Sequence, residues 1–170
     1  MPRLIAAISA LLFCLMSADT AQAARMQTQQ PCVDDPDPWC VSFGTSGGVP
    51  VIRRIRLNAT TAGAAIITFH GSVACINFTA VKGSVQLVSQ IVDDANAVPA
   101  ETEISGLLHT ATLPPEGAAS FNLASTRIFN APAAGLYDFY FKIRRVSLGP
   151  SPGPTTCRVY NAVFTIEFRP

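Results

Sequence analysis

The chain has 170 residues, of which 49% are hydrophobic and 14% charged, and its formal net charge is +1 at pH 7. This length and apolar content suffice for one domain with a proper core. The near-zero charge argues against partners that are recognised by long-range electrostatics, so we expect neither nucleic acid nor an anionic membrane surface as a partner.

The first 23 residues have the features of an export signal. Arg3 gives a basic start, residues 4–16 form a short apolar core, and residues 21–23 read Ala-Gln-Ala, a small-residue cleavage site. The apolar run is too short for a stable membrane span, and no second run is long enough. Removing those 23 residues from 170 leaves a mature chain of 147, which we expect to be exported, either secreted or periplasmic.

Residues 24–49 are polar and rich in turn formers, and we expect them to form an arm ahead of a domain at residues 50–170. The arm contains PCVDDPDPWC at residues 31–40, which we interpret as a covalent staple closed by Cys32–Cys40. Two alternative interpretations of this loop are a calcium site with oxygen ligands and an aromatic platform on which a sugar ring stacks. The candidate ligand-binding residues are Trp39, Asp34, Asp35 and Asp37.

Four cysteines remain after cleavage of the signal, and an even number in an exported chain indicates two disulfides. Three pairings are possible, and proximity in sequence favours Cys32–Cys40, which leaves Cys75–Cys157. The alternation of residues around Cys75 and Cys157 places both on the polar faces of their strands, unless a β-bulge reverses one of them.

After Pro50 the chain consists of short apolar, β-branched and aromatic runs separated by Gly, Pro, Asn or Asp. Regular short strands with turn signals between them indicate an all-β, antiparallel sandwich or barrel of about eight strands. We predict strands at residues 51–57, 64–70, 73–79, 84–92, 104–112, 119–129, 136–146 and 156–168.

The most regular of these strands is LYDFYFKIRRV at residues 136–146. Its alternation predicts a core row of Tyr137, Phe139, Phe141 and Ile143. The opposite row, which we expect in water, is Asp138, Tyr140, Lys142 and Arg144.

The stretch FNAPAAGLYDFYFKI at residues 129–143 resembles a strand of secreted jelly-roll modules: the complement globular-head and tumour-necrosis-factor-like domains, and the protective-antigen type. In that resemblance Gly135 supplies the tight turn before the core row. It implies a jelly-roll sandwich that is extracellular and non-catalytic, and one that is able to form homo-oligomers. The stretch IITFHGSVACIN at residues 66–77 resembles an early strand of chaperone-assembled pilus subunits.

Other polar residues suggest weaker sites. Asp93, Asp94 and Asn96 lie in an acidic loop that could hold calcium, although a solvated turn is the simpler interpretation; we expect no other cofactor. Basic strand faces, at residues 53–56 and 142–145, could dock an acidic partner. Two sequons begin at Asn58 and Asn77.

Catalytic chemistry has little support in the sequence. His70 and His109 belong to no zinc motif, and GTSGG at residues 44–48 is better read as a flexible linker than as a protease nucleophile loop. We therefore predict an exported, non-catalytic module that binds a glycan or protein ligand or serves a structural role. The alternatives are a subunit of an extracellular assembly, such as a pilus-like or trimeric surface structure, and, third, a small secreted hydrolase.

Overall fold

The computed structural model describes residues 26–30, 41–43, 51–100, 106–146 and 155–170. All regular secondary structure in these ranges is β-strand, and none of the described residues forms a helix that could cross a membrane. The strands are β1 (Met26–Gln30), β2 (Val41–Phe43), β3 (Val51–Ala59), β4 (Gly63–Asn77), β5 (Gly83–Val92), β6 (Leu107–Leu113), β7 (Ala118–Ala131), β8 (Gly135–Val146) and β9 (Thr155–Arg169).

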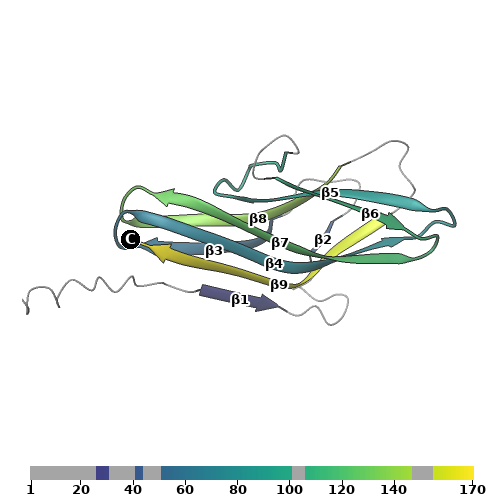
Figure 1. The fold of residues 1–170 in the computed structure, drawn as a ribbon, viewed down its shortest axis with the longest axis horizontal. Helices are drawn as coiled ribbons and strands as arrows, with labels where there is room; N and C mark the ends of the chain where they lie inside the picture. Colours follow the sequence, from purple (N-terminus) through teal and green to yellow (C-terminus); the bar gives the residue numbers. More distant parts are fainter. Residues whose placement is uncertain (1–25, 31–40, 44–50, 101–105, 147–154) are drawn as a thin grey trace, which may run out of the picture.

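The strands form two antiparallel sheets that face each other as layers (Figure 1). Sheet A has the order β1-β9-β4-β7, with β2 also paired to β9, and sheet B has the order β3-β8-β5-β6. From β2 to β9 the pairing runs inward from both ends of the chain: β2 with β9, β3 with β8, β4 with β7, and β5 with β6. This nesting defines a jelly roll, so the predicted fold class is confirmed.

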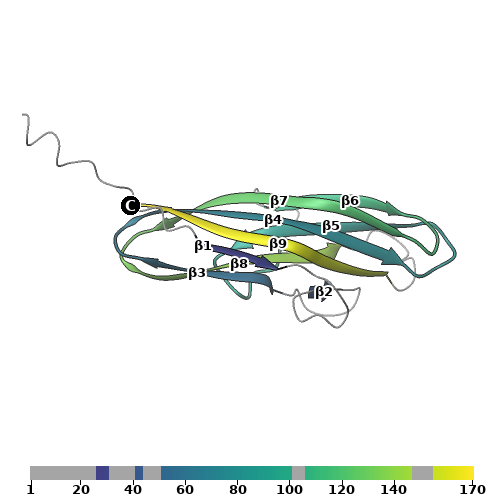
Figure 2. The same cartoon turned by 90° about the horizontal axis from the view of Figure 1, so that it is seen from below.

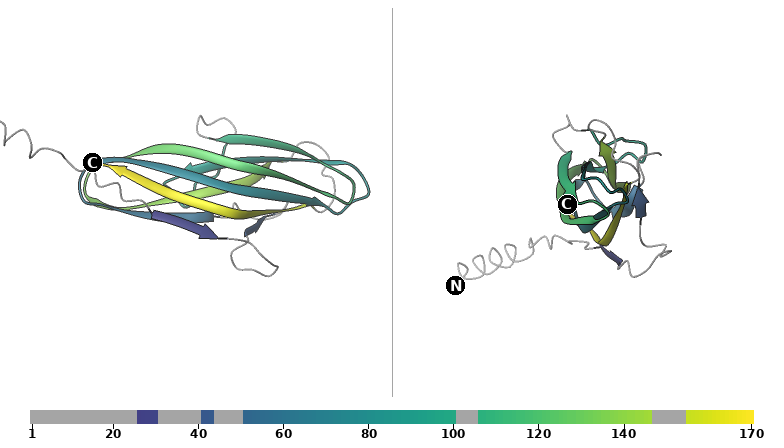
Figure 3. Two further views of the ribbon diagram at one scale, coloured as in Figure 1. Left: turned by 60° about the horizontal axis from the view of Figure 1, so that its bottom comes forward. Right: turned by 90° about the vertical axis from the view of Figure 1, so that its right-hand side faces the viewer.

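The core lies between the two sheets, whose arrangement is seen end-on in the right-hand view of Figure 3. Alternate residues of the long strands point inward, and phenylalanines fill the centre. Phe69 of β4 stacks on Phe141 of β8 with ring centroids 3.5 Å apart, and Phe129 of β7 meets Phe139 of β8 at 4.8 Å. Tyr137 packs at the margin and donates its hydroxyl to the Ala133 carbonyl at 2.9 Å, so the aromatic row predicted for this strand is correct.

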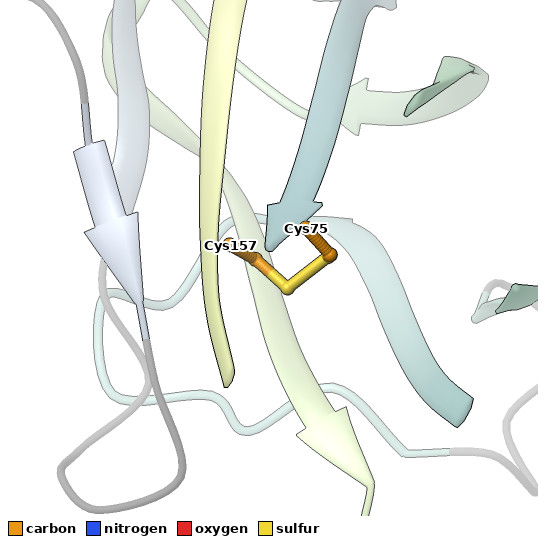
Figure 4. The surroundings of a disulfide bond; sticks show 2 residues. All are labelled: Cys75 and Cys157. Atoms are coloured by element: carbon orange, nitrogen blue, oxygen red, sulfur yellow. A yellow bond between two sulfur atoms is a disulfide. The ribbon is translucent and has the colours of Figure 1, made fainter. Parts of the chain in front are cut away.

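The Cys75–Cys157 disulfide is present and joins the neighbouring strands β4 and β9 (Figure 4). Its predicted position on the polar faces is wrong, because both cysteines are buried in the core. Cys75 shares a face of β4 with Asn77 as predicted, but that face points into the core. For Cys157 the cause is a bulge in β9: the register with β4 shifts between His70 and Ser72, and Asn161 has a φ of 52°. The extra residue reverses the alternation along β9 and turns Cys157 inward.

A second expectation is wrong at the position of this bulge. We predicted two strands, 64–70 and 73–79, separated at Gly71, but β4 is continuous from Gly63 to Asn77. Gly71 lies opposite the bulge, where an added Cβ would come within 2.9 Å of the Phe69 ring. The glycine therefore marks a close approach to the core and not a turn.

The outer face of sheet B is partly covered, against our expectation of a polar row in water. Lys142 is 3% exposed and donates to the Ala95 carbonyl at 2.6 Å, while Arg144 donates to the Pro99 carbonyl. The segment after β5 thus folds back over the strands, which also buries Val88 and Gln90 on their outer face. Both cations here serve to hold this segment.

Candidate functional site: the free border of strand β7

The borders of a β-sheet carry unpaired N–H and C=O groups, and proteins usually protect them with short strands, bulges or charged side chains. The other three borders among the described strands are shorter than β7, and one of them also carries charge and a register shift. At the border that β1 and β2 form, the strands have 5 and 3 residues, and β6 has 7. β3 has 9 residues, a register shift near its start, and three arginines.

β7 is different from these three. It runs for 14 residues along one border of sheet A (Figure 2), and its pairing with β4 continues without a register shift. It contains no proline and a single charged residue, Arg127. That side chain points into the sandwich, where it donates to the Ile91 carbonyl at 2.7 Å and lies 4.7 Å from the centre of the Phe129 ring. The border itself is therefore uncharged.

The disulfide shows which backbone groups of β7 point to the border of the sheet, away from β4. Cys75 and Cys157 are directly opposed with their Cα atoms 4.0 Å apart, the close spacing of a pair that does not exchange backbone hydrogen bonds. The backbone groups of Cys75 consequently point the other way, toward β7. The neighbouring bond from the Asn77 N–H to the Gly117 carbonyl, at 2.8 Å, has the same direction.

The unshifted register extends this result along the whole strand. Odd-numbered residues of β7 direct their N–H and C=O groups to β4, and even-numbered residues direct theirs to the border. Among the described residues, the backbone bonds outside the strand ladders involve none of these even-numbered groups. We call this row the free border of β7: Ala118, Ser120, Asn122, Ala124, Thr126, Ile128 and Asn130.

The outer surface beside the free border is also uncharged. The outward-facing residues of β4 and β7 include no Asp, Glu, Lys or Arg. Cross-strand contacts hold this surface: Thr68 and Thr126 hydroxyls lie 3.2 Å apart, and Ser72 donates to Asn122 Oδ1 at 2.9 Å. The large apolar side chain of Ile128 is also on this surface and is 66% exposed.

The candidate ligand-binding residues of the arm, Trp39, Asp34, Asp35 and Asp37, lie outside the described residues, as does Cys32–Cys40. The loop that could hold calcium is described in part. Asp94 Oδ1 accepts the Asn96 N–H at 2.8 Å and the Asp94 carbonyl accepts the Ala97 N–H at 3.2 Å, which is a capped turn. No group of three or more His, Cys, Asp or Glu suited to a metal occurs in the described part of the chain.

His109 contacts the hydroxyl of Ser89, which is the kind of pair a hydrolase requires, but the contact is buried inside the sandwich. Its Nε2 lies 3.0 Å from Ser89 Oγ, and its ring stacks near Phe121. Ser89 is 1% exposed, so a substrate could reach its oxygen only if the sheets separated. Burial lowers the pKa of His109, as expected of a neutral imidazole in the sandwich. His70 lies on the exposed outer face of β4.

The basic face predicted on β3 and β8 is paired within the protein. Arg56 and Arg54 both bind the Asp138 carboxylate, at 2.8 and 2.7 Å, and hydrogen bonds from these two guanidinium groups hold the pKa of Asp138 well below its usual range. Arg54 also lies 5.9 Å from the Tyr140 ring centre. An acidic partner would have to displace Asp138 to use this face.

The two sequons are placed very differently. Asn58 is exposed on β3. Asn77 is buried, and its Nδ2 donates to the carbonyls of Val81 and Pro114 at 2.8 and 3.0 Å while its Oδ1 accepts from the N–H and hydroxyl of Thr79. Asn77 therefore ties the turn after β4 to the turn before β7, and the folded protein gives no access to its amide.

Comparison with known proteins adds little to this description. No protein-family model matches the chain, and no curated protein does either. Among solved structures, the T13 particle of infectious bursal disease virus is 10% identical, with a TM-score of 0.33 over 85% of this chain and 35% of the other. A VP2 subviral particle of the same virus is 9% identical, with a TM-score of 0.29 over 87% and 37% of the two chains.

Rhinovirus-B5 is 12% identical, with a TM-score of 0.26 over 86% of this chain and 73% of the other. The chain spans about a third of the length of the first structures it matches. At these low TM-scores the likeness carries no argument, and the jelly-roll assignment depends on the strand pairing given above.

Proposed function

We propose that this protein is an exported, non-catalytic jelly-roll module that acts by binding protein, as a subunit of an extracellular or periplasmic assembly. The observation that carries this proposal is the free border of β7. It offers a long uncharged row of backbone donors and acceptors to another strand, which is how β-strand addition joins chains.

Export, the second part of the proposal, is supported by two features. The N-terminal apolar run with its small-residue cleavage site is typical of a signal peptide. The Cys75–Cys157 disulfide is the second, because disulfides form and persist mainly in oxidising compartments. A non-catalytic role is supported by the position of Ser89 and His109, whose contact lies inside the sandwich.

The test is light scattering coupled to size-exclusion chromatography on the oxidised mature protein, over a wide range of concentration. We expect the mass to rise with concentration. Ala124→Lys should keep the protein monomeric, because a lysine in the middle of the border opposes strand pairing. Asn58→Lys, with the same charge change at an exposed site on β3, should associate as the wild type does. A wild-type protein that stays monomeric throughout would refute the proposed function.

A further inference from the structure

We propose that the partner of the free border is a second copy of this chain, paired β7 to β7 in antiparallel orientation about a two-fold axis at Ala124. This inference rests on the proposed function and specifies its interface. Because each copy contributes the same border, such a contact closes on itself and produces a dimer. The two copies of sheet A would then form one continuous sheet.

The direction of the backbone groups restricts the register. Only even-numbered residues of β7 present N–H and C=O groups to the border, so even-numbered residues of one copy must pair with even-numbered residues of the other. Among these registers, the one centred on Ala124 pairs the full length of the border. It places Ala118 opposite Asn130, Asn122 opposite Thr126, and Ala124 opposite itself.

Charge favours the same arrangement. The antiparallel register centred on Ala124 separates the two Arg127 side chains by about 20 Å along the strand, so the charges of the two copies do not meet. In that register Arg127 of one copy faces Phe121 of the other on the inner side of the sheet, a favourable neighbour for a guanidinium. On the outer side Ala118 opposes Asn130, Ser120 opposes Ile128 and Asn122 opposes Thr126, with Ala124 at the axis.

The remaining borders of the sandwich do not offer this self-complementarity. β3 would bring its exposed arginines against those of another copy, and β6 is half as long as β7. The uncharged outer surface of β4 and β7 would continue across the dimer without like charges meeting. Self-pairing through β7 is therefore the association that joins the longest row of backbone groups without bringing like charges together.

Cysteine cross-linking tests the register. Three exposed border residues serve as matched sites in separate variants: Ala124→Cys, Ala118→Cys and Asn130→Cys. With a short bis-maleimide, Ala124→Cys should cross-link to itself, because paired Cα atoms lie about 5.5 Å apart. Ala118→Cys and Asn130→Cys should each fail alone, since each site lies about 40 Å from its own counterpart. A mixture of these two variants should cross-link.

The outcomes separate this inference from the proposed function. If the protein associates and all three variants cross-link alone, the pairing is parallel and the inference is wrong. If the protein associates and Ala124→Cys does not cross-link, the two-fold pairing is wrong while assembly stands. If light scattering shows a monomer at every concentration, the proposed function fails together with its interface.

Discussion

Asn77 illustrates how one buried side chain can organise two turns. Its side-chain NH2 donates hydrogen bonds to the carbonyls of Val81 and Pro114, and its side-chain oxygen accepts two from Thr79. Asn77→Ala leaves these buried groups without partners, so we expect a loss of roughly 2–4 kcal/mol in the free energy of unfolding. Urea denaturation measures this as a lower midpoint with an unchanged slope.

The matched control for that substitution is Asn58→Ala, at the other sequon. Asn58 is exposed, and a surface change of this kind should alter stability by no more than about 0.5 kcal/mol. Equal losses in the two variants would contradict the structural role of Asn77.

His109 should make stability depend on pH. Burial lowers its pKa in the folded state below the ordinary value of 6.5, so the unfolded state binds more protons as the pH falls. Stability attributable to His109 is therefore complete above pH 6.5 and declines below it, until the folded imidazole is itself protonated. Thermal unfolding between pH 7.5 and 5 should show this decline in the wild type and in His70→Gln, and a smaller one in His109→Gln. The same slope in all three proteins would contradict the assignment.

At the scale of the single element, β7 makes a sharp prediction about proline, which has no N–H. Ala124→Pro should leave the sandwich folded and abolish association, because the N–H of Ala124 faces the free border. Ser125→Pro should destabilise the domain by about 1–3 kcal/mol, since the N–H of Ser125 faces β4 and its loss leaves a buried carbonyl of that strand unpaired. Thermal unfolding and light scattering on both variants distinguish these effects. If Ala124→Pro destabilises the domain and Ser125→Pro does not, the direction assigned to the backbone groups of β7 is wrong.

Strand existence was predictable from alternation in most of the domain, and the strand at residues 136–146 shows why. Its aromatic row is regular and enters the core as expected. Alternation fails in β9, because the bulge at Asn161 reverses it without any change in composition.

The strands β1 and β2 were not predicted, since their pairing with β9 is a tertiary contact that no local pattern in this polar segment indicates. The free border of β7 has one signal in sequence, a 14-residue strand with a single charge, but the sequence does not show which strand ends a sheet.

At the scale of the whole molecule, the Cys75–Cys157 bridge joins strands 82 residues apart in sequence. Closing a loop of that length restricts the unfolded chain, and the chain-entropy model gives a stabilisation of about 4–5 kcal/mol. The double variant Cys75→Ala/Cys157→Ala should therefore unfold at a much lower urea concentration than the oxidised protein. A difference under about 1 kcal/mol would contradict this contribution.

The covered outer face of sheet B shows what the sequence could not supply at this scale. Lys142 alternates with buried aromatics, which predicts a side chain in water, but the segment after β5 lies over it. Candidate ligand residues of the arm, including Trp39, lie outside the described residues, and their roles stay predictions.

The central claim is that strand addition at the β7 border drives association, and residue-resolved amide exchange tests it most directly. In dilute protein the amides of Ala124 and Thr126 should exchange quickly and those of Leu123 and Ser125 slowly, because only the latter two bond to β4. At concentrations where light scattering shows association, the amides of Ala124 and Thr126 should become protected as well. Association without any new protection at these two residues would place the interface elsewhere and contradict the account.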